Sequence, residues 1–235
     1  MAFIYEHIRT KGYSPLHLEE HYARMTALSE ELFCAPFDCS SEKLAERIGE
    51  ALRMGGCSPR TENAVCVRRY DSGEIVVEAV EMIYNSFSLR ALRPEGYICR
   101  VSGELLTKNT SAKEAMLELN RTTAQIADKG VAIWTNDSGE VVAIDGAAVI
   151  AVFEDEIRFS QCGSGVEFEL ARKELKSRSR KVTTAPIQIE ELPKIKELLG
   201  IDYRGVTAIE GYGAHHYMDI TAEKIAHLVA TAEKG

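Results

Sequence analysis

The 235-residue chain lacks the features that mark several large protein classes. It has no run of eighteen apolar residues and no charged segment followed by an apolar run at its N-terminus, so we expect neither a membrane span nor an export signal. Its 28 basic residues are outnumbered by 36 acidic ones, and the formal charge of −8 argues against a general binder of nucleic acid or anionic membranes. These absences predict a cytoplasmic protein.

Metal and nucleotide motifs are also missing. The six cysteines form no C-x-x-C pair and have no histidine at zinc-finger spacing, so we expect no metal site and thiols that are reduced and mostly buried. His215 and His216 are adjacent, which predicts a surface loop rather than a metal centre. Gly-x-Gly at 163–165 and at 211–213 does not extend into a Rossmann or Walker pattern. Cys162, beside the first of these, is an alternative candidate as the nucleophile of an unrelated hydrolase.

Hydrophobic residues make up 45% of the chain, enough for a sizeable core. β-rich runs joined by tight turns, with helices inserted singly, favour a mixed α+β fold over a doubly wound sheet. We expect strands at 3–9, 63–70, 74–81, 98–101, 131–135, 140–144, 147–153, 157–160 and 181–185. We expect helices at 17–25, 40–54, 111–128, 166–176 and 189–198, and from 221 onward.

A domain boundary is expected near residue 90. The polar stretch Asn85–Ser88 and the turn Arg93–Gly96 separate the first set of strands and helices from the rest. The sequence therefore predicts a smaller N-terminal α/β domain over residues 1–90 and a larger C-terminal α/β domain over 91–235.

A candidate anion site lies in the first predicted helix. His21 and Arg24 are three residues apart and share a face of that helix. Arginine binds phosphate in a bidentate manner, so the pair could hold an anionic group. The alternative is that both are ordinary polar residues on the solvent side of an amphipathic helix.

The order of several motifs resembles the class IV aminotransferases, the fold-type-IV pyridoxal phosphate enzymes that include D-amino-acid and branched-chain aminotransferases and aminodeoxychorismate lyase. The motifs are Tyr-Glu-x-Ile-Arg at 5–9, Leu-x-x-His-x-x-Arg-Met at 18–25, a lysine before a helix, Ala-Ile-Trp at 132–134 before a Ser-Gly turn, and Ile-Glu-Glu-Leu at 189–192. The chain is divergent from that family and N-terminally short beside it.

The resemblance implies a homodimer of two-domain chains with the site between the domains. It implies pyridoxal 5'-phosphate as cofactor and an amino acid or keto acid as substrate. The implied reaction is amino-group transfer or β-elimination.

By the same resemblance, Lys108 holds the cofactor as an aldimine and moves the substrate's Cα proton. Lys113 is the rival, but its position inside a helix predicts a solvated surface charge; Lys108 could equally be a surface lysine in a polar turn. Arg24 would bind the cofactor phosphate. Tyr5 and Arg204 would lie on the substrate side, although an arginine in a turn is often simply exposed.

The acid that should face the cofactor's pyridine nitrogen is missing from its expected position. Ala143 stands where the family has a glutamate. Strand alternation would put Ala143 and Asp145 on the same face, so Asp145 is the preferred replacement and Glu140 is the other candidate.

The resemblance implies a second phosphate anchor at the helix start formed by Gly165 and Val166, where backbone N–H groups are free to bind an anion. Glu167 stands in place of a threonine there and adds a like charge. Together with Ala143 and Ala148, it motivates an alternative function: a catalytically degenerate relative that keeps the fold as a binding or structural protein.

Overall fold

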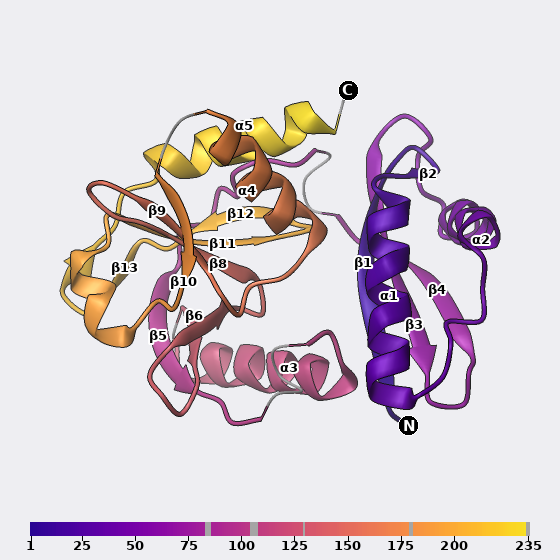
Figure 1. The fold of residues 1–235 in the computed structure, drawn as a ribbon, viewed down its shortest axis with the longest axis horizontal. Coiled ribbons are helices and arrows are strands. Elements are labelled where there is room, and N and C mark those ends of the chain that lie inside the picture. Colours follow the sequence, from indigo (N-terminus) through magenta and orange to yellow (C-terminus); the bar gives the residue numbers. More distant parts are fainter. Residues whose placement is uncertain (83–85, 104–107, 129, 179–180, 234–235) are drawn as a thin grey trace. The chain divides into compact units, whose positions relative to one another are not determined.

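The computed structural model describes residues 1–82, 86–103, 108–128, 130–178 and 181–233, and the chain divides into two compact units. Unit 1 consists of Met1–Ser86 with Asn109–Ser111, and unit 2 of Phe87–Lys108 with Ala112–Gly235. Figure 1 shows the elements of each unit coloured along the sequence. The predicted mixed α+β class is confirmed. The division into domains at residues 1–90 and 91–235 stays a prediction.

Unit 1 is an antiparallel sheet in the order β2-β1-β3-β4, with one face covered by two helices (Figure 1). Its elements are β1 (Phe3–Lys11), β2 (Ser14–Pro15), α1 (Leu18–Phe33), α2 (Ser41–Met54), β3 (Glu62–Tyr70) and β4 (Ile75–Val80). Ile4 and Ile8 of β1 pack into a core with Met25 of α1 and Leu44 of α2. Glu6 lies between the two isoleucines on the same face of the strand, so β1 directs a carboxylate toward the helices.

Unit 2 contains two five-stranded sheets, in the orders β10-β9-β8-β11-β12 and β14-β13-β5-β6-β7. The strands are β5 (Glu95–Arg100), β6 (Val131–Thr135), β7 (Val141–Ile144), β8 (Ala148–Val152), β9 (Ile157–Ser160), β10 (Val182–Ala185), β11 (Glu197–Asp202), β12 (Gly205–Ala208), β13 (Gly211–Tyr212) and β14 (His215–His216). The helices are α3 (Ser111–Ile126), α4 (Val166–Ser177), the 3₁₀ helix η2 (Ile189–Lys194) and α5 (Ile220–Ala232).

Apolar clusters join these elements into layers. Phe168 of α4 and Ile225 of α5 pack on the face of the first sheet that carries Phe159. Side chains of both sheets, among them Ile133, form a second cluster between them. α3 packs against the second sheet around Trp134, and Figure 1 shows it on the side opposite α4 and α5. This packing brings the first turn of α3 close to β7.

The helix predicted over residues 189–198 is wrong. Helical structure covers only Ile189–Lys194, and Glu197–Asp202 form β11, which pairs with β8 and β12. Pro193 has no backbone N–H to continue a helix. The apolar residues that follow it are buried on both faces of a central strand, and such a run lacks the alternation that identifies a half-buried strand.

The hairpin between β11 and β12 requires a glycine. Gly205 has a φ of +118°, and a Cβ there would stand 2.3 Å from the carbonyl oxygen of Ser88. We expect Gly205→Ala to lower the free energy of unfolding by about 3 kcal/mol, because backbone strain and a steric clash add. Gly56→Ala is the matched control, since Gly56 has a φ of +70° with nothing within 4 Å; it should lose about 1–2 kcal/mol. Equal losses in urea unfolding would contradict the clash.

Candidate functional site

A buried carboxylate gathers polar side chains in unit 1. Glu6 is 3% exposed; its Oε1 lies 3.0 Å from Nδ1 of His21 and accepts a hydrogen bond of 2.9 Å from Nε of Arg24, and its Oε2 accepts one of 3.0 Å from Asn109. Burial alone would raise the pKa of Glu6. The charge of Arg24 and the contacts with His21 and Arg24 outweigh burial and lower this pKa to about 2. Glu6 is therefore ionised at neutral pH and fixes its neighbours.

The two polar residues of α1 differ in exposure. His21 is 2% exposed, so the alternative that it is an ordinary residue on the solvent side of the helix is wrong. The Arg24 side chain is 25% exposed, and Glu6 binds it through Nε, the guanidinium nitrogen nearest the side-chain stem. Tyr5 is 4% exposed and leaves β1 on the face opposite Glu6. The phosphate role of Arg24 and the substrate role of Tyr5 stay predictions.

Unit 2 contains a small hollow with a cavity volume of about 10 Å³, room for about one water molecule, which we name the lysine hollow. Lys113, from the first turn of α3, lines it. Much of the remaining wall consists of small residues from the end of β7, the turn into β8 and the loop before α4: Ala143, Gly146, Ala147, Ala148, Gly163 and Ser164. The lysine is therefore bordered mostly by small side chains and backbone.

The prediction that Lys113 is a solvated surface charge is wrong, because its side chain is 8% exposed. The same side of α3 carries Met116 and Leu117, which pack against the core, and the buried Asn120. Residues three, four and seven positions apart share a helix face, so this spacing was a signal for the burial of Lys113. Lys108 is half-buried and is not among the described residues that line the lysine hollow.

The expectation that Ala143 and Asp145 point to the same face is also wrong. β7 ends at Ile144, and Asp145 and Gly146 form the turn into β8 with φ values of +46° and +76°. Strand alternation does not extend into a turn. Ala143 lines the lysine hollow, whereas Asp145 lines another. The Asp-Gly dipeptide was the available signal, because it favours two-residue hairpin turns with positive φ. The role of Asp145 beside a cofactor stays a prediction.

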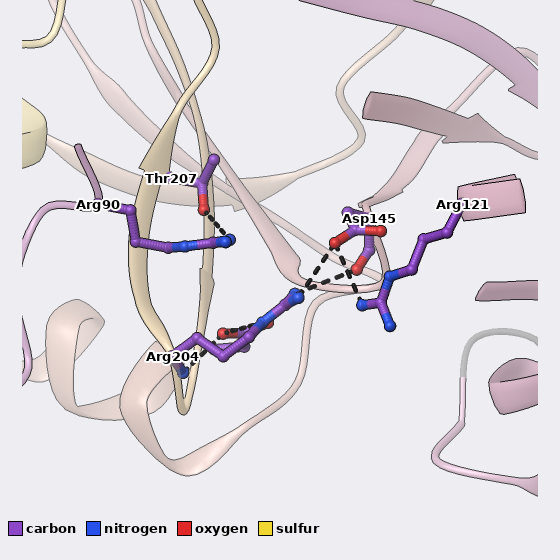
Figure 2. A network of polar contacts seen from close by, with 6 residues as sticks. Arg90, Arg121, Asp145, Arg204 and Thr207 are labelled. Atoms are coloured by element: carbon purple, nitrogen blue, oxygen red, sulfur yellow. Dashed lines mark hydrogen bonds and ion pairs between the residues drawn. The ribbon is translucent and has the colours of Figure 1, made fainter. Parts of the chain in front are cut away.

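The other hollow, of about 160 Å³, is lined by three arginines, and we name it the arginine hollow. Its polar lining residues are Arg90, Arg93, Asp145, Arg204 and Thr207. Figure 2 shows Arg204 between two carboxylates: Nε and Nη2 donate to Asp202 at 2.9 and 2.6 Å, and Nη1 donates to Asp145 at 3.1 Å. Burial raises the pKa of Asp202, but the charge and hydrogen bonds of Arg204 outweigh burial and lower it.

Every guanidinium nitrogen of Arg204 therefore already has an acceptor. This geometry gives Arg204 a part in holding the β11–β12 hairpin to the turn at Asp145. Its contact with a substrate stays a prediction.

Cys162, on the wall of the lysine hollow, keeps its proton at neutral pH. Its Sγ donates to Oε1 of Glu140 at 3.3 Å, and Glu140 is 5% exposed. Burial, followed by the hydrogen bond to Glu140 and its negative charge, raises the pKa of Cys162 to about 11. Because the thiolate is the nucleophile, this environment argues against the hydrolase alternative.

The expectation that the cysteines are mostly buried is wrong. All six lie in the described part of the chain and none forms a disulfide. Cys39 and Cys66 are buried, Cys34 is exposed, and the other three are half-buried. Four of the six cysteines are therefore at least partly exposed.

The start of α4 carries the proposed second anchor. Gly165 precedes the helix with a φ of +146° and provides no side-chain cap, while Val166 and Glu167 of the first turn are both buried. The buried Glu167 side chain adds an acid where an anion would bind. The roles of Gly165 and Val166 stay predictions.

Among the residues that the structure describes, no group of three or more His, Cys, Asp or Glu side chains could hold a metal ion. His215 lies in β14 with Nε2 3.0 Å from the carbonyl oxygen of Ile195. Among the described helices, none is both long and apolar enough to cross a membrane.

No protein-family model and no curated protein matches the sequence, but solved structures match the fold. A putative 4-amino-4-deoxychorismate lyase from Legionella pneumophila has a TM-score of 0.82 at 9% identity and covers 98% of this chain and 91% of its own. A branched-chain aminotransferase from Thermoproteus uzoniensis, solved with norvaline, has a TM-score of 0.82 at 15% identity, covering 98% and 85%.

A third solved structure is the T.th. branched-chain amino acid aminotransferase in complex with N-(5'-phosphopyridoxyl)-L-glutamate. It has a TM-score of 0.78 at 16% identity and covers 100% of this chain and 85% of its own. At such identities the likeness shows the fold: this chain has the fold of the class IV aminotransferases and aminodeoxychorismate lyase, as its motifs predict.

The charge of Glu6 makes stability depend on pH. Since its folded pKa of about 2 lies below the ordinary 4.5, its contribution is complete above pH 4.5 and falls as the pH drops toward 2. We expect Glu6→Gln to lower the free energy of unfolding by about 3 kcal/mol at pH 7 and by about 1 kcal/mol at pH 3. Urea unfolding at both values measures this, with the exposed Glu50→Gln as control. An equal loss at both values would contradict the ionic role.

The environment of Cys162 makes its reactivity depend on Glu140. Iodoacetamide should label the exposed Cys34 at least about tenfold faster than Cys162 at pH 7.5, because labelling requires the thiolate. Glu140→Gln removes the negative charge, so labelling of Cys162 should accelerate, whereas the exposed Glu118→Gln should leave it unchanged. Mass spectrometry of the peptides reports both rates, and equal rates in the two variants would argue against the role of Glu140.

Proposed function

We propose that this protein is a pyridoxal-phosphate-dependent enzyme that acts on the amino group of an amino acid, as an aminotransferase or an aminodeoxychorismate-lyase-like enzyme. The observation that carries the proposal is the likeness of the fold, over nearly the whole chain, to those of solved aminotransferases and a putative lyase. The phosphopyridoxyl-glutamate bound in the T.th. aminotransferase structure supports pyridoxal phosphate as the cofactor.

Covalent attachment of this cofactor needs a lysine amine, and we assign that role from the sequence to Lys108. The lysine hollow carries a second amine, that of Lys113, but its cavity of about 10 Å³ has room for about one water molecule and not for the cofactor ring.

The phosphate needs an anion site. We assign this role to Arg24, whose guanidinium is oriented by Glu6, because arginine matches the geometry of a phosphate group. The backbone N–H groups at Gly165 and Val166 are the second anchor, because a helix start presents free donors and a positive dipole end.

The chemistry divides between the cofactor and the chain. The bound cofactor supplies an electron sink for the negative charge that develops on Cα of the amino acid. A lysine amine, assigned from the sequence to Lys108, takes the proton from that Cα as general base. Tyr5 and Arg204 contact the substrate side of the amino acid or its keto acid. The active form is a homodimer in the cytoplasm.

The visible absorption spectrum of the purified chain with pyridoxal phosphate, before and after borohydride, tests the proposal. We expect a protein-bound band that borohydride abolishes, leaving the phosphopyridoxyl group covalently attached, because reduction makes the carbon–nitrogen bond permanent. The chain unfolded in urea and treated identically is the control for random labelling. A folded chain labelled no more than this control would overturn the proposal.

Screening of D- and L-amino acids as amino donors then distinguishes this enzymatic function from the alternative, a catalytically degenerate relative that acts as a binding or structural protein. That alternative is favoured by Ala143 at the expected acid position and by the buried Glu167, since loss of the acid weakens the electron sink. Covalent labelling without turnover of any donor would support the alternative, and formation of a keto acid would eliminate it.

A further inference from the structure

We propose that the arginine hollow of unit 2 binds a small monocarboxylate with an apolar body, whose carboxylate contacts Arg90. The site is independent of the proposed function, because neither Lys108 nor Arg24 lines this hollow. Its volume is about 160 Å³. A dry protein cavity of about 150 Å³ accommodates benzene, so a single aromatic ring or a short branched alkyl chain fits this space.

The wall of the arginine hollow combines apolar and cationic groups. Its apolar lining residues are Leu92, Pro94, Val131 and Ile144. Its charged lining residues are Arg90, Arg93, Arg204 and Asp145. Small-molecule sites typically have this composition, in which apolar side chains hold the body of the ligand and a few polar groups orient it. Because arginines outnumber acids in the wall, the polar end of the ligand is an anion.

Arg90 is held beside the hollow by β12. Its backbone N–H donates to the carbonyl oxygen of Val206 at 2.8 Å, and its Nη1 donates to the hydroxyl of Thr207 at 3.0 Å. Thr207 is an uncharged acceptor and itself lines the hollow. Figure 2 shows the side chains of Arg90 and Arg204 extending in the same direction. A guanidinium has five N–H donors, so that of Arg90 can bind the Thr207 hydroxyl and a ligand carboxylate together.

The other two arginines have structural partners. Nη1 of Arg93 lies 3.3 Å from the Asp219 carboxylate, and its Nη2 donates to the carbonyl oxygen of Tyr217 at 2.8 Å. Every guanidinium nitrogen of Arg204 has an acceptor. These contacts fix the wall and leave both positive charges beside the hollow. The direct contact with the ligand is therefore assigned to Arg90.

The same wall limits the charge of the ligand. Asp145 lines the hollow, and its carboxylate repels a dianion more strongly than a monoanion. A free phosphate ion would also leave the apolar part of the wall without a contact. A single carboxylate on an apolar body satisfies both parts of the wall.

Binding of benzoate to the full-length wild-type chain tests the proposal without any variant. Benzamide has the same ring without the charge, and inorganic phosphate has charge without the ring. In ¹H–¹⁵N NMR titrations at constant ionic strength, benzoate should bind saturably and shift the amide signals of Arg90, Val131 and Thr207 most. Benzamide and phosphate should bind at least about tenfold more weakly, because each lacks one of the two contacts. Binding of either within about tenfold of benzoate, or no saturable benzoate binding, overturns the proposal.

Variants locate the benzoate. Arg90→Gln removes the cation and should weaken benzoate binding at least about tenfold. Arg100→Gln is the matched control, since the Arg100 side chain is 69% exposed, and it should leave the affinity unchanged. Arg24→Gln removes the candidate anion site of unit 1 and should also leave it unchanged. The amide spectrum shows whether each variant is folded. Loss of binding in Arg24→Gln with retention in Arg90→Gln overturns the proposal.

Discussion

The candidate site of unit 2 depends on the backbone conformation of one two-residue turn. Asp145 and Gly146 both have positive φ, and Ile144 and Ala147 on either side exchange backbone hydrogen bonds of 3.0 and 2.8 Å. The turn brings Gly146 against Leu117 of α3, so only a residue without a side chain fits there. It also directs the Asp145 carboxylate to Arg204. One local conformation thus shapes the lysine hollow and supplies an acid to the arginine hollow.

The buried Glu6 and the half-buried Asp202 follow the same physical rule. A carboxylate removed from water stays ionised only when cations and donors replace its hydration. Glu6 obtains them from Arg24, His21 and Asn109, and Asp202 obtains them from Arg204. Arg24 and Arg204 therefore stabilise the fold through these carboxylates whether or not a ligand is bound. In Arg24 the contact uses Nε, whereas in Arg204 all three nitrogens are engaged, which makes Arg24 the better candidate for an anionic ligand.

Apart from Lys113, the described residues that line the lysine hollow carry no charge. Ala143 and Ala148 are apolar. Cys162 keeps its proton because it is partly buried and donates a hydrogen bond to the Glu140 carboxylate. Folds of this kind accommodate more than one activity, so the function depends on these few side chains rather than on the architecture.

Most elements were predictable because their signals are local. Ser40 accepts a hydrogen bond from the backbone of Lys43 and begins α2, and Asp71-Ser72-Gly73 joins β3 to β4, as their sequence patterns indicate. β11 was missed because a strand buried on both faces has no alternation to distinguish it from a helix. Asp145 was assigned to a strand face, although the glycine after it is typical of a turn.

The sequence by itself determined the mixed α+β class, the segments that become helices and strands, and the order of motifs that resembles a known fold, because these depend on periodicity, turn residues and spacing along the chain. Only the tertiary structure decided which charged groups are buried and what faces them. Lys113 is the clearest case: its charge and helical position are typical of an exposed residue, and only the packing of α3 against β7 and the loop before α4 encloses it. Burial is a property of contacts between segments distant in sequence, and no local pattern specifies it fully.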